Sequence, residues 1–256
     1  MSSMSYIKHI EIESLWNGQR HVAWDLQPDV NILSGANGMG KSTILQRVVK
    51  HLLTLDPDKR SEDGVTLTFE PEEATGVDFD VIRSFDRPVL SSDFLNKMTD
   101  LQLHTELDFT LYQLQRSYLD YQVNLSNRML ELFTAGTPDA HEKAQEIAME
   151  KTHFLDVLDD LFKETGKSVV RTRNEIYFNS LSQEIPAYLL SSGEKQMLII
   201  LLTVLMQRRT RCVLLMDEPE VSLHVEWQQR LLSLIRDLNP NAQIILTTHS
   251  PAIIMD

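Results

Sequence analysis

The chain has 256 residues, enough for one large α/β domain or for a domain with one substantial insertion, and its 42% of hydrophobic residues excludes a disordered protein. Its formal net charge of −13 repels nucleic acid on average, and a lone Cys212 excludes an internal disulfide. The longest apolar run, 197–206, is shorter than the roughly 20 residues that cross a bilayer. With no export signal at the N-terminus, we expect a cytoplasmic protein with no membrane partner; nucleic acid stays an open partner class that the charge does not support.

Residues 1–94 are predicted to form the first part of the α/β lobe. Segments rich in β-branched and aromatic residues predict strands at 6–12, 21–26, 30–33, 65–69 and 79–82. A helix is expected after the glycine-rich loop that follows the third strand, and the polar stretch 56–64 predicts a loop.

Residues 95–166 are predicted to form an inserted helical hairpin. Thr99 followed by Gln102 predicts a capping box at its start. The first helix then carries a coiled-coil-like stripe at spacings of three and four: Leu107, Leu111, Leu114, Tyr118, Tyr121, Leu125, Met129 and Leu132. Gly136 is placed to end this helix, and Gly166 to end the returning one. Such a stripe usually indicates packing, so we expect an arm that the rest of the lobe can lose without unfolding.

Residues 167–256 are predicted to form the second part of the lobe. Short strands come first, followed by an apolar helix after Gly193. A strand at 212–216, a helix through 227–238 and a strand at 243–247 complete the pattern. The alternation predicts a sheet with flanking helices.

The glycine-rich loop carries the first chemical motif. It consists of Gly35, Ala36, Asn37, Gly38, Met39, Gly40, Lys41 and Ser42, followed by Thr43. This sequence matches the phosphate-loop pattern between a strand and a helix, although a glycine-rich turn with Lys-Ser is the alternative. Glycines let backbone N–H groups turn toward phosphates, and the helix N-terminus favours an anion. We expect Lys41 to reach the β- and γ-phosphates of ATP and Ser42 to bind Mg²⁺.

The second motif is a pair of carboxylates after a buried strand. Residues 213–216 are apolar, and Asp217 and Glu218 follow directly. Because α/β sheets bind ligands at the carboxyl ends of their strands, Asp217 is expected to orient Mg²⁺ and Glu218 to polarise the attacking water. A strand that runs into a polar turn looks alike, but the preceding phosphate loop favours the catalytic interpretation.

A third motif precedes the apolar helix. Residues 190–196 read Leu-Ser-Ser-Gly-Glu-Lys-Gln, which resembles the signature motif L-S-G-G-Q of ABC-type ATPases with departures at Ser192 and Glu194. In that family the motif contacts the γ-phosphate of ATP held by the opposite subunit. The resemblance implies this binding role for the segment Ser191, Ser192 and Gly193. Taken alone, the segment indicates a plain N-cap at one of the two serines.

Two further segments narrow the resemblance. His249, after the strand at 243–246, resembles the switch histidine that senses the γ-phosphate. Residues 218–224 read Glu-Pro-Glu-Val-Ser-Leu-His, which is similar to soluble ATPases of the RecF, SMC and overcoming-lysogenization-defect type. There, Ser222 and Leu223 would lie at a subunit interface. The resemblance covers nearly the whole chain except the insertion, and it implies the ABC-type P-loop ATPase fold with an inserted coiled-coil-like arm.

Two features of that family have no clear counterpart. No glutamine occurs between Gln46 and Gln102, so the Q-loop position is open, with Asp86 as a candidate. Trp16 and Trp24 are candidates for stacking on adenine, and either could instead belong to the core.

The resemblance implies an ATP-binding and ATP-hydrolysing switch. It would form a homodimer or higher homo-oligomer around ATP and relay the nucleotide state to a separate effector such as a nuclease, in prokaryotic anti-phage defence. Three alternatives are a DNA-repair ATPase that clamps DNA, a transporter ATPase subunit and a scaffold that barely hydrolyses ATP. Net charge counts against the first, His224 and the insertion against the second, and Glu218 against the third.

Overall fold

The computed structural model describes residues 5–254 except for the segment 84–104 and six single residues, Asn17, Gln19, Pro57, Lys59, Ser61 and Thr137. The chain divides into two compact units, Met1–Ser84 with Gln207–Asp256, and Phe85–Met206. The expected capping box at Thr99, the start of the arm at residue 95 and the Q-loop candidate Asp86 lie outside the described residues. The boundaries expected at residues 95 and 167 stay a prediction.

The first unit is built on a parallel sheet. Its strands stand in the order β3 (Val30–Ser34), β10 (Gln243–Thr248), β9 (Val213–Asp217) and β5 (Phe79–Arg83). All three neighbouring pairs are parallel. Every residue of β9 and β10 is buried, as expected for strands covered on both faces. The predicted α/β sheet is confirmed.

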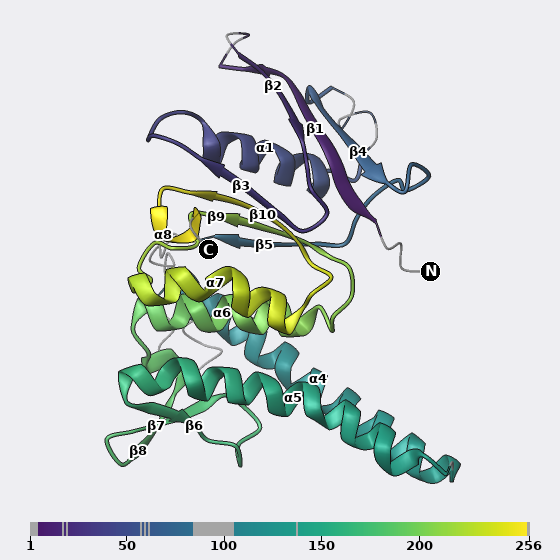
Figure 1. Ribbon diagram of the computed structural model, residues 1–256, viewed down its shortest axis with the longest axis vertical. Coiled ribbons are helices and arrows are strands. Elements are labelled where there is room, and N and C mark those ends of the chain that lie inside the picture. The colour runs from purple at the N-terminus through teal and green to yellow at the C-terminus, as the bar shows by residue number, and fades with distance from the viewer. Residues whose placement is uncertain are drawn as a thin grey trace, which may run out of the picture. The chain divides into compact units, whose positions relative to one another are not determined.

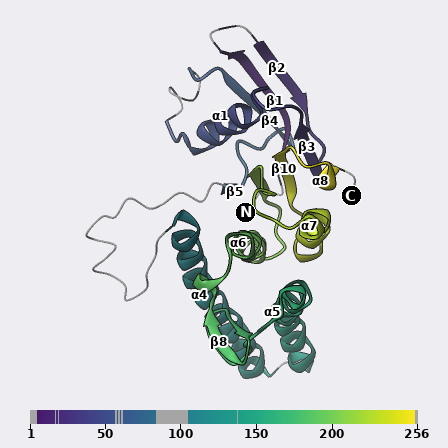
Figure 2. The ribbon, with the colours of Figure 1, turned by 90° about the vertical axis from the view of Figure 1, so that its left-hand side faces the viewer.

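A second, antiparallel sheet lies over the first. It has the order β2 (Arg20–Asp25), β1 (Tyr6–Leu15) and β4 (Val65–Glu70). Helix α1 (Lys41–Leu53) lies between the two sheets (Figure 1) and contributes Val48 to a core shared with Ile10, Leu215 and Ile245. Helix α7 (Val225–Leu238) covers the opposite face of the parallel sheet (Figure 2) and is followed after β10 by the short α8 (Pro251–Ile254).

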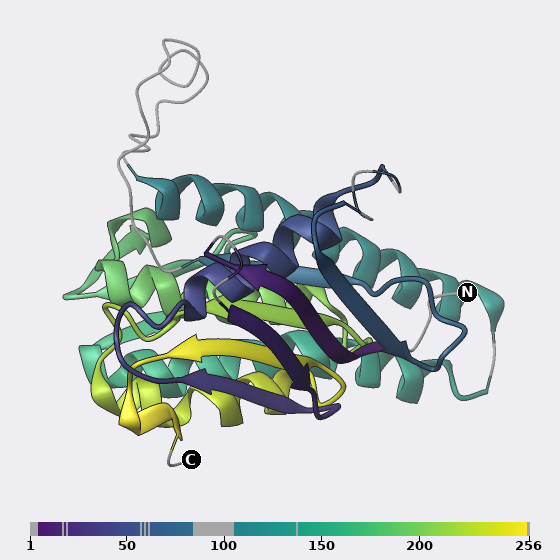
Figure 3. The same ribbon diagram turned by 90° about the horizontal axis from the view of Figure 1, so that it is seen from above.

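The parallel arrangement brings three loops to one edge of the sheet. Thr248 of β10 pairs with Ser34 of β3, and Thr247 pairs with Asp217 of β9. The loops after these strands therefore leave from neighbouring points, and Figure 3 shows the loop before α1 and the helix α8 at this same end. The carboxyl edge of a parallel sheet is where α/β folds bind ligands.

The second unit combines the helical hairpin with the helix that follows the third motif. It contains α4 (Glu106–Ala135), α5 (Ala140–Phe162) and α6 (Ser192–Met206). The small sheet has the order β6 (Lys167–Val169), β7 (Tyr177–Ser180) and β8 (Gln183–Pro186), flanked by the 3-10 turns η1 (Lys163–Thr165) and η2 (Ala187–Leu189). No helix among the described residues is both long and apolar enough to cross a membrane.

The apolar stripe of the hairpin faces inward, as predicted. Its buried members are Leu107, Leu111, Tyr118, Tyr121 and Leu125. Gly136 ends α4 with a φ of 62°, and Gly166 ends the turn after α5 with a φ of 70°. Helix α4 begins in a capping box formed by Thr105 and Asp108, a pair that the sequence analysis did not name.

The hairpin is more than an appended arm. Helix α4 packs against both α5 and α6, and Phe162 at the end of α5 stacks on Phe178 of β7 at 4.6 Å between ring centroids. Removing residues 95–166 would therefore uncover an apolar helix and an aromatic core. The expectation that a short linker can replace the hairpin without unfolding the ATPase core stays a prediction, and the packing of α4 on α6 counts against it.

Candidate nucleotide-binding site

The predicted phosphate loop joins β3 to α1. Gly38 and Gly40 have φ angles of 78° and 91°, in the left-handed region that favours glycine. A Cβ at Gly40 would lie 2.7 Å from the ring of Trp16, so a side chain there meets both strain and a clash. The loop keeps its shape because these positions carry glycine.

The first turn of α1 is prepared for an anion. Gly40 is the N-cap and offers no side-chain hydrogen bond, and no acidic residue lies in the first turn. Backbone N–H groups of Ser42 and Thr43 belong to this turn, where the positive end of the helix dipole lies. Because no side chain caps this helix N-terminus, its backbone N–H groups are suited to bind a phosphate.

Lys41 lies at the centre of the site. The residue is 5% exposed, and its Nζ donates to the carbonyl oxygens of Gly35 at 2.9 Å and Ala36 at 3.1 Å. Nζ also lies 2.9 Å from Nε2 of His249. The ammonium is thus held where the phosphate loop meets the loop after β10.

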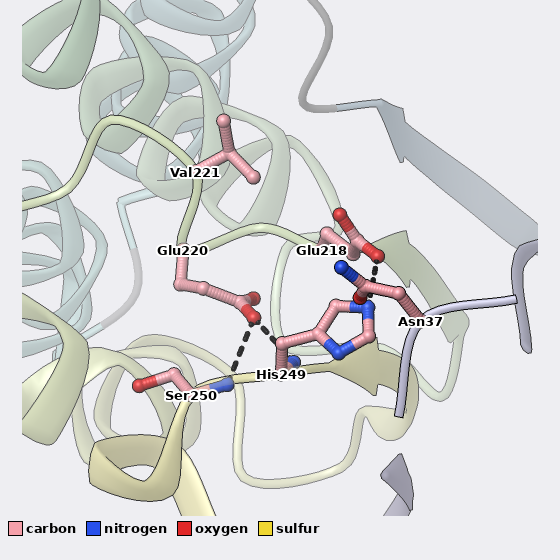
Figure 4. A pocket seen from close by; sticks show the side chains of 6 residues that line it. All are labelled: Asn37, Glu218, Glu220, Val221, His249 and Ser250. Atoms are coloured by element: carbon pink, nitrogen blue, oxygen red, sulfur yellow. Dashed lines mark hydrogen bonds and ion pairs between the residues drawn. The ribbon is translucent and has the colours of Figure 1, made fainter. Parts of the chain in front are cut away.

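The two predicted carboxylates leave β9 in different directions. Asp217 is 7% exposed, and its Oδ1 accepts a hydrogen bond from Thr247 Oγ1 at 2.6 Å. Glu218 has a φ of 47° and directs its Oε1 to within 2.8 Å of His249 Nε2 (Figure 4). One imidazole nitrogen therefore lies within hydrogen-bond distance of both the Lys41 ammonium and the Glu218 carboxylate.

A pocket of about 610 Å³ opens beside these groups. Its lining comes from the phosphate loop, the loop after β9 and the loop after β10: Asn37, Glu218, Glu220, Val221, His249 and Ser250. Figure 4 shows the Glu218 and His249 side chains pointing toward each other, with Asn37 beside them. Met39 of the phosphate loop is 48% exposed. A pocket lined by a carboxylate and an imidazole, with the Lys41 ammonium in contact with that imidazole, suits the binding of a phosphorylated ligand.

Sequence reasoning missed Glu220 and Thr247. Oε1 of Glu220 accepts hydrogen bonds from Thr248 Oγ1, from His249 N at 2.8 Å and from Ser250 N at 3.2 Å. The signal for Glu220 was the second glutamate of the Glu-Pro-Glu segment. Nothing in sequence spacing marks Thr247 as a partner of Asp217.

The signature-like segment belongs to the second unit. Ser191 is the N-cap of α6: its Oγ accepts a hydrogen bond from the Glu194 N–H at 3.4 Å, and its own N–H donates to Glu194 Oε2 at 3.0 Å. The N-cap interpretation is therefore confirmed for Ser191, while Ser192 opens the helix and both serines are exposed. The contact of Ser191, Ser192 and Gly193 with a nucleotide across an interface stays a prediction.

Charged residues of this segment are tied to the surrounding scaffold. Glu194 Oε1 lies 2.7 Å from Lys167 Nζ, and Lys195 Nζ lies 2.7 Å from Asp108 Oδ1. Burial raises the pKa of Glu194, but hydrogen bonds from Lys167 and Ser191 outweigh it, so the pKa lies below its ordinary value of 4.5. The first turn of α6 is thus held by β6 on one side and by α4 on the other.

The two candidate aromatics have different surroundings. Trp16 packs on Gly40 of the phosphate loop and carries the Arg20 guanidinium 5.3 Å from its ring centroid. Trp24 stands opposite Ile10 in the antiparallel sheet and packs against the core. Only Trp16 lies beside the phosphate loop.

Leu223 departs from expectation. Its side chain is 6% exposed and belongs to the unit's own interior, whereas Ser222 is exposed with a φ of 74°. The expectation that Ser222 and Leu223 lie at a subunit interface stays a prediction, with Ser222 as the member that is exposed in the single chain.

Known proteins match the chain in sequence and in fold. Residues 143–256 match the family described as "AAA domain, putative AbiEii toxin, Type IV TA system". The Septu protein PtuA of Bacillus thuringiensis is 23% identical over an alignment of 299 positions, which spans 98% of this chain and 73% of that protein.

Solved structures of SMC heads share the fold. The Smc head domain from Pyrococcus furiosus, bound to the C-terminal domain of ScpA, superposes with a TM-score of 0.54 at 13% identity, covering 98% of this chain and 91% of that one. An SmcHead bound to the C-winged helix domain of ScpA gives 0.55 at 14% identity, with the same coverage. These likenesses show that the chain has the α/β fold of the SMC heads, with the phosphate loop, the Asp217–Glu218 pair and the His249 loop at one edge of its parallel sheet.

Proposed function

We propose that this protein binds ATP with Mg²⁺, hydrolyses it, and uses the nucleotide to assemble a homodimer that signals to an effector protein. The observation that carries the proposal is the convergence of Lys41, Glu218 and His249 at the carboxyl edge of the parallel sheet. A cation, a carboxylate and an imidazole from three separate loops meet beside a helix N-terminus, which suits phosphoryl chemistry.

The residues present fit ATP and its metal. The loop from Gly35 to Gly40 would cradle the phosphates with backbone N–H groups, extended by Ser42 and Thr43 in the first turn of α1. Lys41 would exchange its carbonyl partners for phosphate oxygens. The Ser42 hydroxyl and Asp217 would hold Mg²⁺, which supplies charge neutralisation at the phosphates when bound.

Glu218 and His249 divide the remaining work. Glu218 would accept a proton from the attacking water, and His249 would contact the γ-phosphate. Glu218 and His249 contact each other at 2.8 Å, and both line the pocket. A ligand in the pocket would replace this contact with contacts of its own. Occupation of the site would therefore change the setting of the loops after β9 and β10.

The dimer would complete the site with the exposed segment Ser191–Gly193 of a second subunit. The SMC heads that share this fold are bound to a domain of another protein, ScpA, and the Septu protein matches nearly the whole chain. These likenesses support a separate effector, such as a nuclease, and a role in prokaryotic anti-phage defence.

Glu218→Gln tests the proposal. It keeps the size of the side chain but removes the general base, so ATP hydrolysis should fall by roughly two to four orders of magnitude while ATP binding persists. Phosphate release and calorimetric titration with Mg·ATP measure the two. Glu226→Gln is the matched control, since Glu226 is a 61% exposed glutamate of the same unit. Normal hydrolysis by Glu218→Gln would refute the catalytic assignment.

Light scattering tests the dimer. The Glu218→Gln protein should double its mass with Mg·ATP because the γ-phosphate is not cleaved. The Glu218→Gln, Ser191→Arg double variant should remain monomeric, since the new side chain blocks the segment. A Glu218→Gln protein that binds ATP without change in mass would contradict ATP-gated assembly.

A further inference from the structure

The loop after β9 and the loop after β10 share a buried carboxylate that takes no part in the chemistry described above. Glu220 is 7% exposed, and its Oε1 accepts from three consecutive residues, Thr248, His249 and Ser250. Two of these donors are backbone N–H groups, so the carboxylate holds the main chain of residues 248–250 after β10, here called the switch loop. Such charge-assisted hydrogen bonds are among the stronger ones in proteins.

Gln228 of α7 makes further hydrogen bonds to both loops. Ser250 Oγ donates to Gln228 Oε1 at 2.6 Å, and Gln228 Nε2 donates to the carbonyl oxygen of Leu223 at 2.9 Å. Helix α7 thereby joins the loop of residues 218–224 to the switch loop from the other side. The two loops form one hydrogen-bonded body.

The other carboxylate oxygen shows why Glu220 is placed here. Oε2 is buried and has no hydrogen-bond partner among the described residues. Burying a carboxylate with one oxygen unsatisfied is unfavourable, so the contacts of Oε1 must account for the placement of the side chain. Those contacts all end on the segment that carries His249.

We propose that Glu220 is a positioning residue for His249: it ties the switch loop to the loop that follows the catalytic pair. The His249 ring reaches Lys41 and Glu218 because its backbone is held at Glu220. A movement of the loop 218–224, whose Ser222 is exposed, is thereby transmitted to the imidazole. The inference rests on the proposed role of His249 in nucleotide binding and hydrolysis.

The test compares two substitutions of similar size. Glu220→Met fills the buried space without an acceptor, whereas Glu220→Gln keeps an oxygen for the loop N–H groups. In full-length protein with ¹³C-labelled histidine, the ring signal of His249 is assigned by its loss in His249→Gln. We expect this signal to shift or broaden in Glu220→Met and to return to its original position in Glu220→Gln. A folded Glu220→Met protein with an unchanged His249 signal would overturn the proposal.

Hydrolysis supplies the second readout. Glu220→Met should lower kcat by about tenfold with little change in KM, because Lys41 and the phosphate loop are untouched. In a His249→Gln background the same change should lower kcat by less than about twofold, since Glu220 acts through His249. Full additivity would overturn the positioning role.

The readouts separate the two proposals. A wild-type protein that does not hydrolyse ATP defeats the proposed function, while the His249 signal still decides the role of Glu220. If Glu220→Met does not fold, Thr248→Val removes one of the three donors, and a smaller shift of the same signal is expected. No shift in that variant would count against the proposal.

Discussion

The phosphate-loop region and the signature-like region use charge in opposite ways. In the first unit, His249 contacts both Lys41 and Glu218, and Glu218 and His249 line a pocket, so their partners can be exchanged for a ligand's atoms. In the second unit, Glu194 and Lys195 are each locked into a nearly buried ion pair with the scaffold. The first arrangement suits ligand binding and catalysis, whereas the second fixes the position of the N-terminus of α6.

Substitutions in the two regions should therefore have different effects. Loss of a charge in the first region should change ligand binding or turnover more than folding. Loss of a charge in the second should change stability first, because a buried ion left without its partner is costly.

Lys195→Met should give the largest effect. It leaves the Asp108 carboxylate, whose side chain is 4% exposed, without its ammonium, so the free energy of unfolding should fall by about 3 kcal/mol or more in urea titrations. Asp108→Asn in the same protein should restore part of the loss, because the buried charge is gone. The control is Lys143→Met, whose exposed pair with Asp139 should contribute little to the free energy of unfolding. Equal losses at the two sites would erase the contrast.

Lys41→Ala should weaken Mg·ATP binding by about a hundredfold, because the ammonium facing the phosphates is lost. Calorimetric titration measures the affinity. Lys50→Ala, an exposed lysine at the other end of α1, is the control and should leave it unchanged. Unaltered affinity in a folded Lys41→Ala protein would place the nucleotide elsewhere.

Trp16→Ala should weaken ATP binding by about tenfold if the indole stacks on the purine. Tripolyphosphate, which lacks the base, should bind the variant and the original protein equally. Competition titrations with the two ligands measure the difference. A parallel loss for tripolyphosphate would instead assign Trp16 to support of Gly40 in the phosphate loop.

Acid should remove a small, specific part of the stability of the second unit. The folded pKa of Glu194 lies below 4.5, so its contribution is present above that value and is lost as pH falls through the folded pKa. The stability difference between the original protein and Glu194→Gln should therefore shrink from pH 6 toward pH 3.5. Urea titrations at several pH values measure it, and a difference independent of pH would argue against an ionised Glu194.

Sequence alone determined the local part of the architecture. Glycines placed before Lys41, and the apolar runs that became β9 and β10, depend on conformations and burial that neighbouring residues specify. The same holds for the hairpin stripe and the ends of its helices at Gly136 and Gly166, since helical spacing and left-handed caps are local properties.

Tertiary structure alone decided which distant groups meet. Glu220 and the switch loop are about thirty residues apart, Asp108 and Lys195 almost ninety, and no spacing rule relates them. Parallel strand pairing brought the first pair to one sheet edge, and packing of α4 on α6 brought the second together. Burial then made each contact matter, because an ion or carboxylate removed from water needs a partner that only the folded chain supplies.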